Sequence, residues 1–192
     1  MASTALPELS KYPLSVIVFW SDNGWHLGEK QHWHKSTLWQ RSTHVPMIVA
    51  GEAAGIKEAG TARRQPVSLL DIYPTLVDVC GLPANARNEG TSLKPLLGSA
   101  GRKWRPAVST YLQNNHAVID EQWRYIRYAD GGEELYDRRA DPHEYTNLAG
   151  EARHTRRKRE MARWIPAKNV TPAPERSEFE FDFATHTYKR KP

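Results

Sequence analysis

A nearly continuous apolar run is the feature that most limits what this chain can fold into. It extends from Leu14 to Trp20, reads LSVIVFW, and gives way abruptly to polar residues at Ser21. Because apolar and polar residues do not alternate, the run predicts a strand that is buried on both faces of a parallel sheet. Ligands bind beyond the carboxyl ends of strands in open α/β sheets, so the residues after Trp20 are expected to face a cleft.

An acid, an amide and a glycine follow this strand. Asp22 and Asn23 offer a carboxylate and an amide oxygen, the hard donors that Ca²⁺ and Mg²⁺ prefer, and Gly24 permits a tight turn behind them. The same three residues also suit an ordinary turn that closes a strand. Spacing alone therefore leaves both a metal site and a simple turn open.

The connection to the second apolar run, Val45 to Ala50, is rich in basic residues. It carries His26, Lys30, His32, His34, Lys35 and His44. A lysine ammonium brings three hydrogen-bond donors and a positive charge, so such a loop is typical of an anion-binding site. Each histidine taken singly is better explained as a loop or packing residue than as a ligand. A zinc hydrolase is a weaker interpretation, because the close histidines are not accompanied by an HExxH motif.

Three motifs in this region resemble the sulfatase family, most closely its iduronate sulfatase-like bacterial branch. They are SDNGWHLGEK from Ser21 to Lys30, WHK from Trp33 to Lys35, and THVPMIV from Thr43 to Val49. The resemblance implies the alkaline-phosphatase-like α/β fold and hydrolysis of sulfate esters by a formylglycine beside a bound Ca²⁺, with Mg²⁺ as the lesser alternative. It covers residues 14 to 165, which correspond to the latter part of a family member, and no strand followed by the family's Asp-Asp pair is present.

The resemblance also assigns roles to individual residues. Asp22 and Asn23 match the metal ligands, although several relatives have histidine at the second position, and Lys35 matches the lysine that contacts the sulfate. His26 and His34 are candidate substrate contacts. His116 is a further candidate, because the family uses loops of its C-terminal subdomain to shape the substrate mouth, although a plain hairpin turn explains it as well. The expected substrate is a sulfated small molecule or glycan.

The nucleophile of the family is missing from this chain. Formylglycine forms from a Cys or Ser within a motif that also requires Pro or Ala and then Arg, and the run after the single cysteine, Cys80-Gly81-Leu82-Pro83-Ala84, lacks both. Cys80 lies on an apolar helix face and is expected to be a small buried hydrophobe. The chain alone is therefore expected to be inactive, with an N-terminal sulfatase half attached, supplied by a partner, or lost.

The remaining sequence predicts two further regions. Residues 1–104 form the C-terminal part of the α/β core, with a helix that starts at a capping box of Ser68 and Asp71 and ends at Gly81. Residues 105–165 form a small antiparallel α+β subdomain, with short strands at 107–111, 117–119, 123–128 and 134–136. In the third of these strands, charged residues such as Arg124 are expected to face water. Residues 166–192 form a tail.

The formal net charge of +5 reflects a cluster of basic residues in a predicted helix from Glu151 to Trp164. Such a helix could bind a polyanion, so a polyanion-binding or structural module, or an inactive fragment, is the alternative function. Nucleic acid is not favoured, because no stacking aromatics interleave with the charges. The sequence has no apolar run long enough to span a membrane and no signal-peptide pattern, and localisation stays unassigned.

Overall fold

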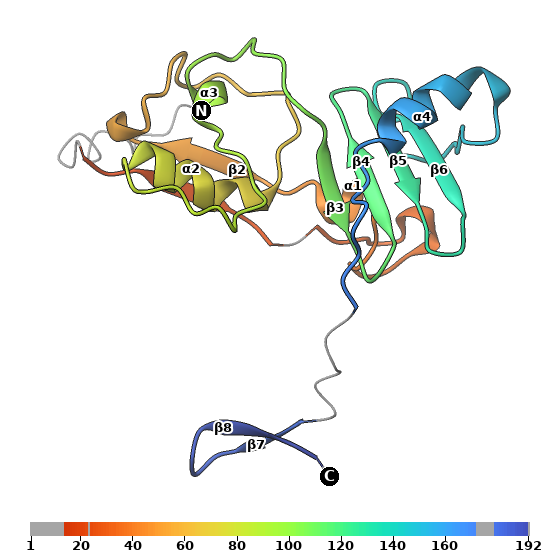
Figure 1. The fold of residues 1–192 in the computed structure, drawn as a ribbon. Coiled ribbons are helices and arrows are strands. Elements are labelled where there is room, and N and C mark those ends of the chain that lie inside the picture. Colours follow the sequence, from red (N-terminus) through yellow and green to blue (C-terminus); the bar gives the residue numbers. More distant parts are fainter. Residues whose placement is uncertain (1–13, 23, 172–178, 192) are drawn as a thin grey trace.

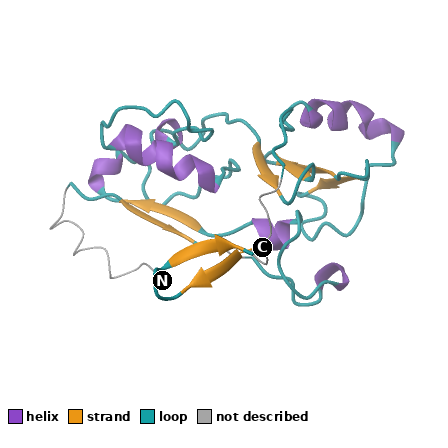
Figure 2. Ribbon diagram, turned by 60° about the horizontal axis from the view of Figure 1, so that its bottom comes forward, coloured by secondary structure: helices purple, strands orange, loops and turns teal. Residues whose placement is uncertain are grey.

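The computed structural model describes residues 14–22, 24–171 and 179–191 (Figure 1). Their strands form three separate antiparallel sheets. The sheets contain β1 with β2, then β3, β4, β5 and β6 in that order, and finally β7 with β8. In Figures 1 and 2 helix α2 (Ile72–Val79) lies beside the β1–β2 pair, and helix α4 (Thr155–Ala162) lies against the four-stranded sheet.

The first sheet pairs β1 (Ile17–Trp20) with β2 (Met47–Ala50), and Ile17 lies opposite Ala50. Both strands were predicted, but the predicted burial of β1 within a parallel sheet is wrong for the part of the chain that the structure describes. Phe19 is 60% exposed and Trp20 is 48% exposed. An apolar strand is buried on both faces only when helices and further strands cover it, and here β1 has one antiparallel partner.

The capping box is confirmed at the start of the next helical segment. Ser68 precedes a short 3-10 turn, η4 (Leu69–Asp71), which continues into α2, and the Asp71 carboxylate accepts a hydrogen bond from the Ser68 amide at 3.0 Å. The prediction that Cys80 is buried is wrong. Cys80 is exposed because it lies at the C-cap of α2, where the chain turns away through Gly81 at φ 66°.

The predicted antiparallel subdomain is confirmed. Its strands are β3 (Ala107–Thr110), β4 (His116–Ile119), β5 (Trp123–Arg127) and β6 (Glu133–Asp137). One face packs against α4 in an apolar cluster made of Val118, Tyr125, Leu135, Ala149, Met161 and Ile165. The opposite face covers Leu38, which belongs to the connection between β1 and β2. The sheet therefore lies between its own helix and the segment that carries the candidate site.

Short helical pieces complete the described fold. They are η2 (Glu29–Gln31), α1 (Gln40–Thr43), η3 (Glu52–Ala54), α3 (Lys94–Leu97) and η5 (Ala152–His154), which leads into α4. No described helix is long and apolar enough to cross a bilayer. Within the predicted tail, β7 (Phe179–Asp182) and β8 (Thr187–Arg190) form a hairpin that the sequence did not predict. Residues 1–13, which belong to the predicted α/β core region, lie outside the described residues.

Candidate functional site

The candidate site is the segment from Asp22 to His44, which joins β1 to β2. Asp22 is exposed two residues beyond the end of β1, and Asn23 lies outside the described residues. The chain then turns back against α1, because the Gly24 amide donates to the Ser42 carbonyl at 3.2 Å. A Cβ atom on Gly24 would lie 2.0 Å from the Arg41 carbonyl oxygen, so this close approach requires glycine.

A tight turn closes the segment into a loop. The Gly28 amide donates to the His32 carbonyl at 2.9 Å, and the His26 amide donates to the His34 carbonyl at 3.3 Å. Within this turn Lys30 and Gln31 have φ angles of 54° and 58°. Left-handed backbone at consecutive residues other than glycine is costly, and it persists only where surrounding contacts hold it.

The turn brings three imidazole rings together. The ring centroids of His26 and His32 are 5.1 Å apart, and those of His32 and His34 are 4.1 Å apart. His26 is fully buried and its Nε2 lies 3.0 Å from Thr37 Oγ1. Burial lowers the pKa of His26, and the neighbouring His32 lowers it further, so the neutral ring is favoured.

This histidine cluster does not form a zinc site. Nδ1 of His26 and Nε2 of His32 are buried and have no hydrogen-bond partner among the described residues. No group of three or more histidine, cysteine, aspartate or glutamate residues within that part of the chain is arranged to hold a metal ion. The rings of His26 and His32 meet edge to face at 86°. His34 is exposed, and its Nδ1 contacts the Lys35 carbonyl.

The two lysines of the loop have different environments. The Lys30 ammonium donates to the Tyr136 hydroxyl at 3.0 Å and to the Glu144 carbonyl, and it lies 4.6 Å from the centre of the Trp39 ring. Burial lowers the pKa of Lys30, while Glu134 and Glu144 oppose that shift. Lys35 is exposed, and its ammonium has no contact with the described residues. Of these two lysines, Lys35 is therefore the one available to bind an anion.

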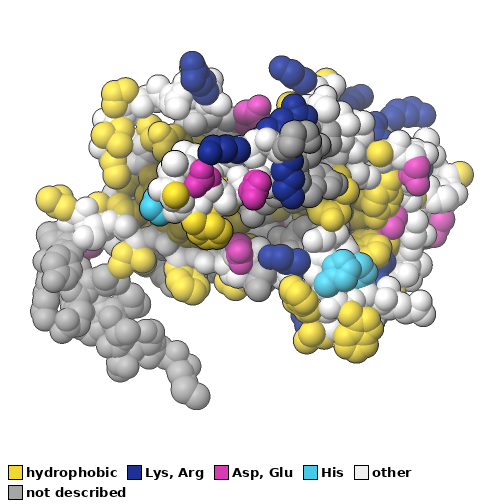
Figure 3. All heavy atoms as spheres, turned by 90° about the horizontal axis from the view of Figure 1, so that it is seen from below, with side chains coloured by type: hydrophobic (Ala, Val, Ile, Leu, Met, Phe, Trp, Pro, Cys, Tyr) yellow, Lys and Arg dark blue, Asp and Glu magenta, His cyan; other side chains and the backbone are white. Residues whose placement is uncertain are grey.

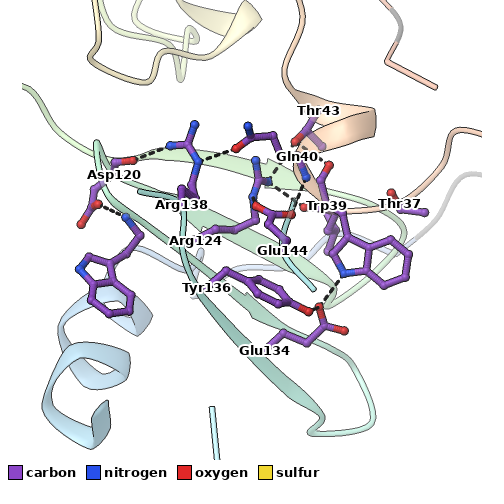
Figure 4. Close-up of polar contacts among 12 residues, drawn as sticks. Thr37, Trp39, Gln40, Thr43, Asp120, Arg124, Glu134, Tyr136, Arg138 and Glu144 are labelled. Atoms are coloured by element: carbon purple, nitrogen blue, oxygen red, sulfur yellow. Dashed lines mark hydrogen bonds and ion pairs between the residues drawn. The ribbon is translucent and has the colours of Figure 1, made fainter. Parts of the chain in front are cut away.

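A buried network attaches the end of the loop to the four-stranded sheet (Figure 4). Nε of Arg124 lies 2.6 Å from the Glu144 carboxylate, and these side chains are 2% and 1% exposed. Arg124 also donates to the Leu38 carbonyl at 2.8 Å, and the other carboxylate oxygen of Glu144 accepts from the Gln40 amide at 2.8 Å. Arg124 was expected to face water. That prediction is wrong, because Glu144, its charged partner, lies on the same face of the sheet as the Arg124 side chain.

Two further contacts extend the network. The Trp39 indole donates to Glu134 at 2.6 Å, and Arg138 donates to the Gln40 side chain at 2.6 Å. These contacts were not predicted from the sequence. The sequence offered little indication of them, because the paired residues are far apart in the chain and no motif with a fixed spacing links them.

His116 does not lie in a substrate-facing loop. It belongs to β4, it is 2% exposed, and its two ring nitrogens lie 2.9 Å from Thr110 Oγ1 and 2.7 Å from Asn169 Oδ1. Both nitrogens are thus occupied by the protein itself. A groove of about 540 Å³ instead lies beside the loop, lined by Gly28, Lys30, Gln31, Trp39 and Tyr145.

The positive charge of the basic helix α4 is partly offset by neighbouring carboxylates. Arg156 lies 2.9 Å from Glu160, and Lys158 lies 2.6 Å from Glu133 on β6. Arg157 lies 3.4 Å from Glu160. These pairs leave less positive charge for a polyanion than the sequence suggested.

Comparisons with known proteins cover the loop and the sheet together. Residues 28–170 match the family model described as N-sulphoglucosamine sulphohydrolase, C-terminal. The chain is 40% identical over 158 residues to a protein named Sulfatase from Formosa agariphila, covering 82% of this chain and 31% of that protein. It is 32% identical over 167 residues to Arylsulfatase K from Homo sapiens, covering 76% of this chain and 30% of that protein.

A solved structure shares the fold with a TM-score of 0.66 at 23% identity, covering 82% of this chain and 34% of the other. It shows a protein in complex with its substrate, D-glucosamine-2-N,6-O-disulfate. The chain therefore spans about a third of the length of the curated relatives that it matches.

Proposed function

The chain belongs to the sulfatase family, and we propose that it forms the C-terminal part of a sulfate ester hydrolase that acts on a sulfated carbohydrate. The observation that carries this proposal is Lys35, an exposed cation on a loop whose other lysine is held inside the protein. The sulfated glucosamine bound by the structural relative supports a sulfated sugar as the substrate class. An iduronate sulfatase-like specificity stays an expectation from the sequence motifs.

In this proposal the Lys35 ammonium contacts a sulfate oxygen. Negative charge develops on the sulfate oxygens and the leaving oxygen as the ester bond breaks, and a fixed cation stabilises that charge. His34 neighbours Lys35, and its ring nitrogen contacts the Lys35 carbonyl, which orders the backbone at this position. His34 and the groove beside the loop are the proposed contacts for the sugar.

We propose that Asp22 and Asn23 are ligands of a calcium ion. Their oxygens are of the kind that Ca²⁺ prefers, and Asp22 is exposed at the carboxyl end of β1, where ligands are expected. Ca²⁺ takes about six to eight oxygen ligands, so further carboxylates are required from elsewhere. When bound, the ion would withdraw charge from the sulfate as a Lewis acid.

The nucleophile and the missing carboxylates require a further part of the protein. The β1–β2 pair exposes large apolar side chains, including Phe19 at 60% and Ile48 at 57%. Figure 3 shows yellow hydrophobic side chains spread over one face of the molecule. Apolar faces and unpaired strand edges of this kind are covered in a stable protein. We propose that the nucleophile-bearing part of the sulfatase covers them.

The first experiment is the intact mass of the native polypeptide, detected with an antibody against residues 22–35. A product much heavier than 21.9 kDa would mean that a further segment is attached. That product should then release inorganic sulfate from D-glucosamine-2-N,6-O-disulfate. A product at 21.9 kDa would favour the alternative, an inactive fragment or a binding module, unless a separate partner restores sulfate release. Calcium-dependent sulfate release by the 192-residue chain alone would contradict the half-site proposal.

A further inference from the structure

The loop between β1 and β2 is seated on the face of the four-stranded sheet that lies opposite α4. Leu38 is 3% exposed and packs in a cluster with Ala117, Ile126 and Tyr136 of the sheet, and the Trp39 ring lies against the same cluster. Apolar contact alone is not directional, so it does not fix the orientation of the loop. The polar contacts made around this cluster supply that direction.

The buried pair of Arg124 and Glu144 holds the segment on both sides of Gln40. Arg124 divides its donors among the Glu144 carboxylate, the Leu38 carbonyl at 2.8 Å and the Thr43 hydroxyl at 3.0 Å. The Glu144 carboxylate in turn accepts from the Gln40 amide at 2.8 Å. A planar guanidinium presents donors in a fixed fork, so these acceptors define the position of the backbone from Leu38 to Thr43.

Glu144 also adopts an unfavourable backbone conformation. Its φ angle is 59°, in the left-handed region that favours glycine. Two contacts to Asp141 hold this turn: the Glu144 amide donates to the Asp141 carbonyl at 3.1 Å, and the Thr146 amide donates to the Asp141 carboxylate at 2.7 Å. Strained residues persist where the surrounding structure over-determines them. In this conformation the Glu144 carboxylate reaches the loop and accepts a hydrogen bond from the Gln40 amide.

A second anchor, Lys30, holds the loop on the N-terminal side of Lys35. The Lys30 ammonium reaches the Tyr136 hydroxyl on β6 and the Glu144 carbonyl. At the other anchor the Trp39 indole adds a contact to Glu134, also on β6. The residues between the two anchors, from Trp33 to Ser36, are exposed. Lys35 lies within this exposed stretch.

We propose that Arg124 and Glu144 are positioning residues, which together with Lys30 hold the loop on both sides of Lys35 and so present it in the exposed stretch from Trp33 to Ser36. This inference rests on the proposed function, because that function gives Lys35 its role. The sheet of the C-terminal subdomain then serves as the support of the anion-binding loop. Of the two lysines in the loop, Lys30 holds the loop against the sheet, and Lys35 is available to bind the ligand.

Amide hydrogen exchange measured by NMR on the whole chain tests the proposal. In Arg124→Lys the charge pair is kept, but a single ammonium cannot occupy the positions of the guanidinium donors. We expect the amides of Gln40, Ser42 and Thr43 to exchange at least tenfold faster. Amides of β4 and β6 should change less than twofold, because a loss of general stability would accelerate loop and sheet alike. Arg127→Lys, an exposed arginine on the same strand, is the control.

A second pair of variants keeps the test decisive if Arg124→Lys does not fold. Lys30→Met keeps the aliphatic stem and removes the ammonium, and the amides of Gly28 and His32 should then exchange at least threefold faster. Lys35→Met should leave them within twofold. Equal effects of Lys30→Met and Lys35→Met, or unchanged loop exchange in Arg124→Lys, would overturn the proposal.

No sulfate ester enters the exchange measurement. Faster loop exchange in the variants, without sulfate release by the native protein, would support the positioning role of Arg124, Glu144 and Lys30 and contradict the proposed sulfatase activity. Sulfate release by the native protein, with unchanged loop exchange in the variants, would support the activity and contradict the positioning role.

Discussion

The Glu144 carboxylate lies 2.6 Å from Nε of Arg124, although the two residues are 20 positions apart in the chain. Arg124 comes from β5, and Glu144 comes from the turn that follows β6. Burial lowers the pKa of Arg124, whereas the charge of Glu144 opposes that shift and favours the ionised form. The ion pair thus connects the four-stranded sheet to the candidate site, and each of its two buried charges would be uncompensated without the other.

Removal of one partner should be much more harmful than removal of both. Glu144→Ala leaves the Arg124 charge buried and uncompensated, so the free energy of unfolding should fall by about 3–5 kcal/mol. The double variant Arg124→Met with Glu144→Leu should recover most of that loss. Urea unfolding followed by tryptophan fluorescence measures both values. The exposed Glu121→Ala is the control and should stay within about 0.5 kcal/mol. A double variant less stable than Glu144→Ala would contradict this account.

Gly24 should be the least replaceable of the glycines that are near the proposed metal ligands. Gly24→Ala would place a Cβ atom 2.0 Å from the Arg41 carbonyl oxygen, so either the turn or α1 must move. We expect a loss of roughly 1–3 kcal/mol, which is typical of overpacking. Gly101→Ala is the matched control, because a Cβ there meets nothing within 4 Å. Equal urea midpoints for the two variants would show that the close approach is not required.

Local patterns predicted the local structure well. The alternation between Ala107 and Asp137 identified four strands, and the Ser68 capping box identified the start of a helix, because both signals depend on neighbouring residues. Burial was predicted less well, since it depends on contacts between distant segments. Arg124 is charged yet buried because Glu144 meets it, and Cys80 is apolar yet exposed because its helix ends there.

The same distinction applies to the candidate site. The motifs identified the loop and Lys35, and the family model covers Lys35 and the loop from Gly28 onward. They did not reveal that Lys30 is held by Tyr136, which lies 106 positions away, or that the ring of His116 is fully occupied. The type of residue therefore indicated which chemistry is available. Only the tertiary contacts determine which of those groups is free.

Stability should fall as the pH is lowered from about 7.5 to 5.5. The pKa of His26 is lowered in the folded state, chiefly by burial, so the unfolded chain binds more protons in this range. The contribution of His26 is fully present above the unfolded histidine pKa of about 6.5 and is lost as the pH falls below it. The slope of unfolding free energy against pH should flatten in His26→Gln and stay unchanged in the exposed His143→Gln. A steeper slope in His26→Gln would contradict the direction of the shift.

Lys35→Met should reduce sulfate release by the complete native sulfatase about 10²–10³-fold in kcat, the loss typical of removing one donor to a developing negative charge. The exposed Lys103→Met serves as the control for loss of a surface charge. An effect confined to KM would show instead that Lys35 only binds the substrate. Equal activities of the two variants would remove Lys35 from the site.

Calcium removal provides a separate test of the metal ligands. EGTA should abolish sulfate release by the complete native protein, and added Ca²⁺ should restore it, because the ion is proposed to withdraw charge from the sulfate oxygens. In Asp22→Ala far more Ca²⁺ should be needed for the same recovery, since the variant loses a charged ligand. Asp130→Ala, which alters an exposed turn after β5, should behave as the unaltered protein does. The same calcium requirement in Asp22→Ala and Asp130→Ala would mean that Asp22 is only a turn residue, the simpler interpretation of its Asp-Asn-Gly sequence.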